Sequence, residues 1–447
     1  MVLYGWKLRK GWAMKYALVN GFVLDGTLNE SGKMVPHKGW VILVDGERIA
    51  EVGDLPTSEL MGYEVVDLAG AWAMPGLINL HAHLAASGKP PKANAKPIDY
   101  KKLFDTLSKI PPVLAGYRAL CAAQAKLQLL SGVTTLRTVG GILDFDGQIR
   151  DQINAGKAVG PRMLVCNTGV SVPGGHFAGS LATEASTPEE AAEHVRQIAA
   201  TNPDWIKLMI TGGVMDASEE GEPGVLRMPP ELVRAACDQA HELGYRVAAH
   251  VESPEGVRVA LENGVDTIEH GAQPNEEILE LFKERGAADI CTISPAVPYT
   301  LFPLEDSHVP EIAKTNGKVV MDGIIACAKG CLAEGIPVGL GTDSGCPFIT
   351  HYDMWRELVY FQKYCDVSAD FALHTATQIN AEILGLADEV GTLEAGKSAD
   401  LIVCDANPLE DLSRLRKLRA VICQGRLYKN PRPRKMANVE RLLDIYC

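Results

Sequence analysis

Residues 203–213 read PDWIKLMITGG and place a lysine in the middle of a short apolar run. The residues Ile206, Leu208 and Ile210 predict a strand that is buried on both faces, as in a parallel sheet. Desolvating an ammonium group is costly, so a buried Lys207 must be paired, neutralised or chemically altered. The alternative is a lysine near the strand's end that reaches solvent or a carboxylate.

Seven further short apolar segments alternate with helical stretches between residues 76 and 345. Eight strand–helix units predict an α/β protein built on a (β/α)8 TIM barrel, with a doubly wound open sheet as the alternative. No phosphate-binding glycine fingerprint follows the first strand, which disfavours the open sheet. The expected helices include 187–201, with a threonine N-cap, and 229–244, with Pro at its start and Gly at its end. The expected strands are 76–83, 133–140, 162–169, 205–213, 245–252, 266–271, 289–295 and 337–345.

The two ends of the chain share a different pattern. Residues from about Lys15 to Asp67 show short β-rich runs separated by Gly and Asp turns, which predict a small antiparallel sheet, and the C-terminal segment shows the same pattern. Because short sheets need a partner to cover their apolar face, we expect both ends to form one small β-sandwich domain. The expected domains are 1–73 for its first part, 74–388 for the barrel, and 389–447 for its second part with a C-terminal extension.

Composition excludes several classes of protein. The 447 residues hold 43 Lys and Arg against 56 Asp and Glu, a net charge of −13, which argues against nucleic-acid or anionic-membrane partners. The 11 cysteines include no CxxC pair, so we expect a reduced, cytoplasmic protein without disulfides and without a cysteine zinc site. Residues 1–21 lack the apolar core of a signal peptide, and no run reaches membrane-spanning length.

Metal-binding side chains end five of the expected strands. In a barrel, chemistry is concentrated where the strands end at the C-terminal face. Imidazole and carboxylate groups are suitable ligands for Zn²⁺ and related ions, and four histidines with one aspartate exceed what one tetrahedral catalytic zinc needs. The pattern therefore predicts two divalent metal ions, with Zn²⁺ as the expected ion. The residues are His81, His83, Lys207, His250, His270 and Asp343.

Lys207 has a role in such a site. Two close cations need an anionic bridge, which an ammonium group cannot supply. A buried lysine beside cations has a lowered pKa, and its neutral amine can capture CO₂ to become a carbamate with two oxygens. We therefore interpret Lys207 as a CO₂-derived bridging carbamate.

These motifs together resemble the amidohydrolase superfamily, in its prolidase-like and imidazolonepropionase-like branch. The segments that carry the resemblance are PGLINLHAHL (75–84), VTTLRTVGG (133–141), IKLMITGG (206–213), AAHVES (248–253), TIEHG (267–271), GTDSG (341–345) and ALHTATQINAEILGL (372–386). A further match is GTLEAGKSADLIVCDANPLEDL near the C-terminus. The resemblance implies that His81, His83 and Asp343 bind one metal, that His250 and His270 bind the other, and that carboxylated Lys207 bridges them.

The resemblance also implies an activity, namely hydrolysis of a small amide such as an Xaa-Pro dipeptide or an N-acyl amino acid. A hydroxide shared by the two metals attacks the carbonyl, and Asp343 takes the proton and returns it to the leaving amine. His176, in VPGGHF, matches a GGH segment that contacts substrate beside the metals; the alternative is a loop histidine bonded to backbone. Homo-oligomerisation is expected by resemblance.

Two positions depart from the family pattern. Some dipeptide-cleaving relatives have a tyrosine two residues after the fifth-strand histidine, where this chain has Glu252. An acid there would repel a substrate carboxylate and favour a cationic or polar group, unless it is solvated or paired with Arg258. The second-strand segment of the family reads Arg-Asp, whereas here Arg137 is followed by Thr138, which questions a local Arg–carboxylate pair.

Three rival functions remain open. A mononuclear deaminase or cyclic-amide hydrolase shares most of these ligands but places an acid where this chain has Ser253. An ester, lactone or organophosphate hydrolase would use the same two metals, and an interaction scaffold would have lost ligands that are all present here. Substrate choice is expected to lie in the loops 84–115 and 293–320, whereas Trp355 and Tyr360 are expected to pack in the core.

Overall fold

A computed structural model describes residues 15–92 and 100–447. The signal-peptide prediction falls mainly on residues 1–14, which lie outside the described residues, as do the first 14 residues of the expected N-terminal domain. None of the helices in the described ranges combines the length and apolar character needed to cross a lipid bilayer.

All eight strands expected from the apolar segments are present, and they run parallel to one another in two hydrogen-bonded sheets. One sheet has the order β10-β9-β8 and the other β12-β11-β13-β14-β15-β16-β17. Two backbone bonds join the sheets, one from Asp204 N just before β13 to Val165 O on β10 (2.7 Å) and one from Asp343 N after β17 to His81 O on β8 (2.9 Å). The strands are β8 (Leu77–Ala82), β9 (Val133–Thr138), β10 (Arg162–Val165), β11 (Gly169–Ser171), β12 (Ala182–Glu184), β13 (Trp205–Met209), β14 (Arg246–Val251), β15 (Thr267–His270), β16 (Ala288–Cys291) and β17 (Val338–Leu340).

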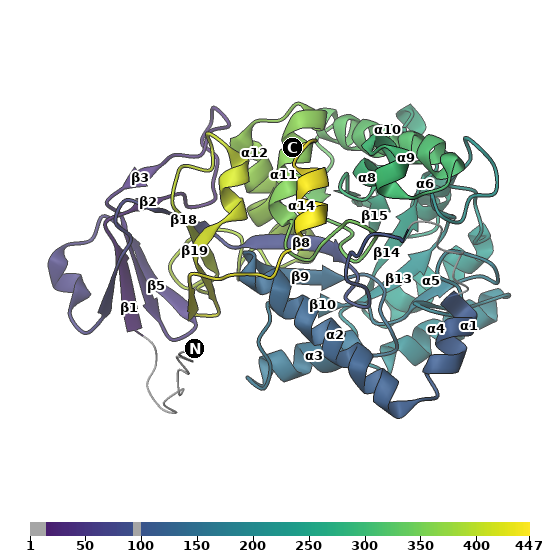
Figure 1. Ribbon diagram of the computed structural model, residues 1–447, viewed down its shortest axis with the longest axis horizontal. Coiled ribbons are helices and arrows are strands. Elements are labelled where there is room, and N and C mark those ends of the chain that lie inside the picture. The colour runs from purple at the N-terminus through teal and green to yellow at the C-terminus, as the bar shows by residue number, and fades with distance from the viewer. Residues whose placement is uncertain (1–14, 93–99) are drawn as a thin grey trace.

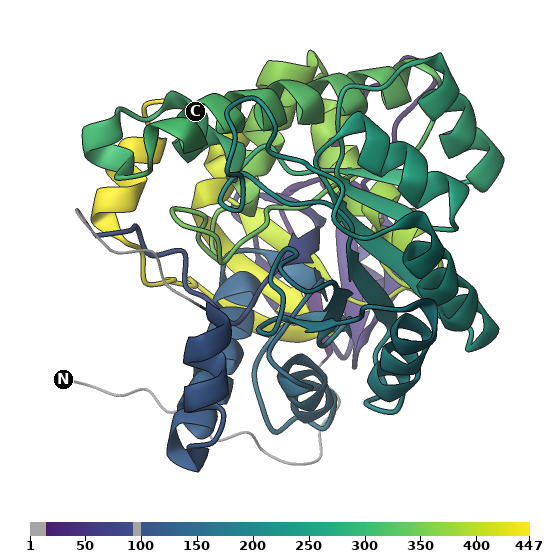
Figure 2. The same cartoon turned by 90° about the vertical axis from the view of Figure 1, so that its right-hand side faces the viewer.

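Helices surround these strands, as Figure 2 shows. The expected N-cap is confirmed at α4, where the Thr187 side chain accepts a hydrogen bond from Glu190 N (3.2 Å). Trp355 and Tyr360 are buried in the core, as expected. The helices are α1 (Tyr100–Leu107), α2 (Pro111–Leu130), α3 (Phe145–Asn154), α4 (Pro188–Ala199), α5 (Pro230–Glu242), α6 (Pro254–Glu262), α7 (Glu276–Arg285), α8 (Ala296–Leu301), α9 (Leu304–Ser307), α10 (Glu311–Ala333), α11 (Met354–Cys365), α12 (Ala369–His374), α13 (Asn380–Leu384) and α14 (Ala437–Leu443).

The two ends of the chain meet in one sheet, at the left of Figure 1. Strand β18 from the C-terminal segment pairs antiparallel with β7 from the N-terminal segment, in the order β20-β19-β18-β7-β2-β3. A four-stranded sheet, β5-β4-β1-β6, shares a buried apolar cluster with it. The strands are β1 (Lys15–Val19), β2 (Phe22–Val23), β3 (His37–Lys38), β4 (Val41–Asp45), β5 (Arg48–Gly53), β6 (Glu64–Asp67), β7 (Trp72–Pro75), β18 (Leu401–Cys404), β19 (Leu418–Cys423) and β20 (Arg426–Lys429).

The expected purely antiparallel pairing of this N-terminal region is wrong in two places. Strand β6 pairs parallel with β1, and β2 pairs parallel with β7. After β5 the chain passes through the short helix Thr57–Leu60 and returns to the end of the sheet where β1 begins. Strand β6 therefore runs in the same direction as β1. Alternation of apolar residues shows that a segment is a strand but not which way its neighbour runs.

A buried ion pair ties three of the parallel strands together. Arg137 on β9 donates to Glu269 Oε1 on β15 (2.6 Å) and to the carbonyl of Leu80 on β8 (2.7 Å). Both charged side chains are fully buried. The absence of an aspartate at position 138 thus leaves Arg137 paired, but with a distant carboxylate instead of a local one.

This pair gives a prediction for stability. We expect Arg137→Met to lower the free energy of unfolding by about 3–5 kcal/mol, because Glu269 is left as an uncompensated buried charge. The double change Arg137→Met with Glu269→Gln should recover part of that loss. Denaturant unfolding of both variants tests this, and a loss below about 1 kcal/mol, typical of exposed pairs, would contradict it.

Candidate metal centre

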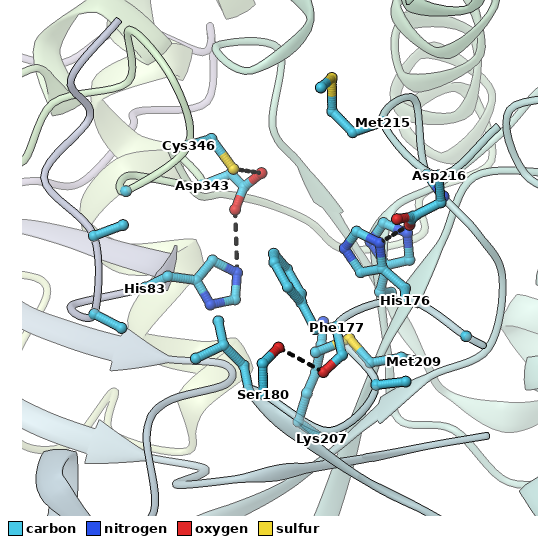
Figure 3. Close-up of a pocket in the computed structure, with 18 of the residues that line it drawn as sticks. His83, His176, Phe177, Ser180, Lys207, Met209, Met215, Asp216, Asp343 and Cys346 are labelled. Carbon is cyan, nitrogen blue, oxygen red and sulfur yellow. Dashed lines mark hydrogen bonds and ion pairs between the residues drawn. The ribbon is translucent and has the colours of Figure 1, made fainter. Parts of the chain in front are cut away.

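One cavity of about 740 Å³ collects every residue that the sequence singled out for chemistry. It opens at the carboxyl ends of the parallel strands, and Figure 3 shows several of its side chains facing a common space. The predicted residues that line it are His81, His83, His176, Lys207, His250, Glu252, His270 and Asp343.

His81, His83 and Asp343 form the first group of possible ligands. The Nε2 atoms of His81 and His83 lie 3.4 and 3.2 Å from Asp343 Oδ1. Each histidine uses its other nitrogen elsewhere: His81 Nδ1 donates to Glu269 (2.7 Å), and His83 Nδ1 donates to the carbonyl of Gly140 (2.8 Å). Metal-binding histidines are oriented in this way, with one ring nitrogen tied back and the other facing the ion.

His250 and His270 form the second group, and His270 also lies within 4.8 Å of the ligand atoms of His81 and Asp343, so the two groups adjoin. Donor atoms of His250, His270 and Glu252 lie within 4.8 Å of one another. His270 Nδ1 is 2.7 Å from Thr292 Oγ1, and His250 Nε2 donates to the carbonyl of Gly212 (3.1 Å). Burial, followed by neighbouring positive groups, lowers the pKa of both histidines well below the usual range. Both rings are therefore neutral, which is the form that binds metals.

Two of these ligands stand in unusual backbone conformations. His270 has a φ of 74° and Asp343 a φ of 53°, both in the left-handed region that non-glycine residues rarely adopt. At position 343 the backbone N–H donates to the carbonyl of His81, which holds the turn. Such strain concentrates at functional sites, where the surrounding structure enforces it.

Lys207 lies on β13 and lines the same cavity as both groups. Its side chain is buried, and its Nζ has no hydrogen-bond partner in the described part of the chain. Burial lowers the pKa of Lys207 to about 8, although Glu269 and Asp343 act in the opposite direction. Because an unpartnered buried amine is costly as a cation, the residues present fit a site in which this nitrogen is neutral or modified.

Asp343 has a second partner that sequence reasoning missed. The thiol of Cys346 donates to Asp343 Oδ2 (3.1 Å), while Oδ1 faces the two histidines. Burial alone would raise the pKa of Asp343, but His81 and His83 hold it well below the usual range. The only signal in the sequence was the nearness of Cys346 to GTDSG, which does not distinguish it from a packed cysteine.

His176 is held by a residue that the sequence did not reveal. Its Nδ1 donates to Asp216, and its ring stacks on that of His250 with centroids 4.1 Å apart and planes 7° apart. The alternative of a loop histidine bonded to backbone is wrong. This arrangement leaves Nε2 of His176 as its remaining polar atom.

Glu252 lies at the same end of the cavity as His250. Its Oε2 is shielded from solvent and has no hydrogen-bond partner among the described residues. Burial, followed by the nearby Asp343 and Asp216, raises the pKa of Glu252 to about 8. The alternative of a salt bridge with Arg258 is wrong, since Arg258 pairs with Glu262 (2.8 Å) on the same helix.

The cavity walls are largely apolar. The expected loops contribute Phe104, Leu107 and Tyr299 among others. Two further wall segments are 173–181, of which only the part around His176 was expected, and 213–216, which was not expected to form a wall. Lys101, a cation on the wall, is paired with Glu184.

Several known proteins resemble this chain in sequence and in fold. A structure from Bifidobacterium longum described as a candidate prolidase shares 35% identity and a TM-score of 0.83, covering 98% of this chain and 100% of that one. A Xaa-Pro dipeptidase structure with bound methionine shares 29% identity and a TM-score of 0.78, covering 93% and 100%. Ochratoxinase of Aspergillus niger is 25% identical over 441 residues, which is 91% of this chain and 87% of that protein.

A model of the amidohydrolase family matches residues 72–428, a range that contains all the predicted ligands. The chain therefore belongs to the amidohydrolase family and is a metal-dependent hydrolase of C–N bonds.

Proposed function

We propose that this protein is a binuclear zinc-dependent hydrolase of a small amide, a dipeptide such as Xaa-Pro or an N-acyl amino acid. The observation that carries the proposal is the buried Nζ of Lys207, which has no partner among the described residues although its charge influences His250, His270 and Glu269. A carbamate on this nitrogen would turn an unfavourable buried cation into the anion that two close metal ions need.

In this proposal the ligands divide into two sets. His81, His83 and Asp343 would hold one ion, His250 and His270 would hold the other, and a carbamate on Lys207 would supply the negative charge that both need. When bound, two such ions lower the pKa of a water molecule towards neutrality and polarise the carbonyl of the amide.

The protein's own groups supply the proton transfers and the orientation. Asp343 accepts a proton from the attacking water and returns it to the amine nitrogen that leaves. Cys346 fixes one oxygen of this carboxylate, which supports a defined position for the transfer. His176, held by Asp216, presents Nε2 to the substrate from the opposite wall.

The wall of the cavity supports an apolar substrate with a small polar core. Phe104, Leu107 and Tyr299 surround the polar residues, and one of the related structures is named a Xaa-Pro dipeptidase. The mononuclear deaminase is less well supported, because Ser253 caps helix α6 by accepting from Gly256 N (3.2 Å). An ester or lactone remains chemically equivalent at the same two metals.

We extend the proposal to the architecture of the chain. The eight parallel strands and the two backbone hydrogen bonds between their sheets support a closed (β/α)8 barrel over residues 74–388. The two sheets around the shared apolar cluster support a β-sandwich formed by residues 1–73 and 389–447. We further propose a cytoplasmic homo-oligomer.

The first test measures metal content and activity together. Protein prepared with Zn²⁺ and bicarbonate should carry two metals in the Lys207 centre and cleave dipeptides or N-acyl amino acids. Lys207→Met should lose metal from this centre and at least about 100-fold in amide turnover, because the bridge is gone. The exposed Lys109→Met serves as the control. Retention of metal and turnover in Lys207→Met would overturn the bridging role.

A second test concerns Asp216. Asp216→Asn removes the negative charge that fixes the tautomer and ring orientation of His176, so we expect kcat to fall by about 10–100-fold with unchanged metal content. An unchanged kcat would show that His176 does not act on the substrate.

A third test concerns substrate choice. Above its pKa of about 8, Glu252 is an anion that repels a substrate carboxylate, so at such a pH Glu252→Gln should raise the ratio of kcat/KM for Xaa-Pro over its prolinamide about 10-fold, equivalent to about 1.4 kcal/mol. Well below that pKa the ratio should change little. Glu262→Gln, a change on the exposed side of α6, should leave this ratio unchanged. A ratio that moves equally in both variants would remove Glu252 from substrate selection.

A further inference from the structure

Three side chains with metal-binding atoms lie together away from the cavity described above. Asp289 on β16 faces Cys327 and Cys331 on α10, and their ligand atoms all lie within 4.8 Å of one another. None of the three lines the cavity that holds Lys207. We call this set the Asp–Cys cluster.

The strand geometry explains why Asp289 points towards the helix. Its neighbours Ala288 and Ile290 pack in the apolar cluster inside the strands, so the alternating side chain of Asp289 faces outward. Cys327 and Cys331 are four residues apart on α10 and therefore lie on one face of that helix. The cluster thus connects a strand to the helix that covers it.

Among the described residues, none makes a hydrogen bond of standard geometry to the Asp289 carboxylate, although the Cys327 thiol lies beside it. The residue has an exposed fraction of 0%, and neither of its carboxylate oxygens has a hydrogen-bond partner in the described residues. An isolated buried carboxylate is among the costliest arrangements in a protein core. It is tolerated when the group is protonated or when it binds a cation.

The backbone leaves room for the three groups to approach. A Cβ at Gly271 would lie 2.8 Å from both Asp289 Oδ1 and Cys327 Sγ. Gly271 also has a φ of 81°, which favours glycine. A side chain at this position would separate the carboxylate from the thiol.

We propose that Asp289, Cys327 and Cys331 bind a structural zinc ion. Two thiolates and one carboxylate match the ligands that Zn²⁺ takes, whereas Mg²⁺ and Ca²⁺ prefer oxygen alone. Binding releases the protons of the two thiols, and that of the carboxyl group if it is protonated, so the ion replaces an unsatisfied acid with a coordinated anion. Cys365 at the end of α11 is close enough to raise the pKa of Asp289 and is a candidate for a fourth ligand.

The ion would fasten α10 to β16, the strand that follows His270 in the sheet. This role is independent of the amide hydrolysis proposed above. It differs from the expectation of no cysteine zinc site, which rested on the absence of CxxC pairs. The spacing here is CAKGC, and the third ligand comes from a strand 38 residues earlier in the chain.

Cobalt substitution tests the proposal directly, because a cobalt–thiolate bond absorbs in the near ultraviolet and a histidine–carboxylate site does not. The experiment uses the Cys346→Ser protein, since Cys346 is the thiol that lines the other cavity. Loading with Co²⁺ should produce the thiolate band, together with one metal per chain that survives in Lys207→Met. Absence of the band in a protein that has bound cobalt would overturn the proposal.

Two variants test whether Asp289 is a ligand and whether the band depends on the cysteines of the cluster. Asp289→Asn keeps the shape of a protonated carboxyl group but cannot supply an anionic ligand. We expect it to lose one metal per chain, to weaken the band and to lower Tm. Cys121→Ser, a change at another buried cysteine on α2, should retain both the band and the metal. Unchanged metal content and an equal or higher Tm in the Asp289→Asn variant would show that Asp289 is simply a protonated core residue.

Discussion

The buried contact between Arg137, Glu269 and His81 is the constraint on which the metal centre depends. Glu269 accepts from Arg137 with one oxygen and from His81 with the other, so a single carboxylate links a guanidinium to a proposed ligand. Burial would raise the pKa of Glu269, but Arg137 and His81 hold it far below the usual value. The carboxylate therefore stays ionised, fixes the tautomer of His81 and leaves Nε2 of that ring to face Asp343.

The same low-dielectric environment sets the protonation states of the other groups. It keeps His250 and His270 neutral, brings Lys207 towards its neutral form and makes Glu252 a weak acid. A site prepared in this way holds donors for cations without excess positive charge of its own. Its chemistry is thus decided by burial as much as by residue type.

The features that the sequence predicts are those that depend on local, periodic patterns of residues. Each of the eight parallel strands follows from an apolar run, and Lys207 and His250 follow from their places in those runs. Sequence reasoning missed Asp216 and Cys346 because both reach their partners from loops, where position does not reveal direction. It could not pair Arg137 with Glu269, 132 residues apart, because the two side chains come from different hydrogen-bonded sheets, and no local pattern shows that β9 and β15 approach each other.

The Asp–Cys cluster is a second feature that the sequence alone does not reveal. A pattern search looks for cysteines in pairs, whereas here a strand supplies the acid and a helix supplies the thiols. In the sequence, Asp289 is only one residue of a strand segment. Its lack of partners among the described residues becomes visible only when the surrounding packing is known.

The sheet shared by both ends of the chain has a consequence for synthesis on the ribosome. Strand β7 finds its neighbour β18 only after the whole catalytic region has been made. At about 10 residues per second, the edge of β7 waits roughly half a minute for its partner. An unpaired strand edge can pair with other chains, so the region of parallel strands between β7 and β18 must fold while this sheet is still incomplete, and slow translation prolongs the exposure of that edge.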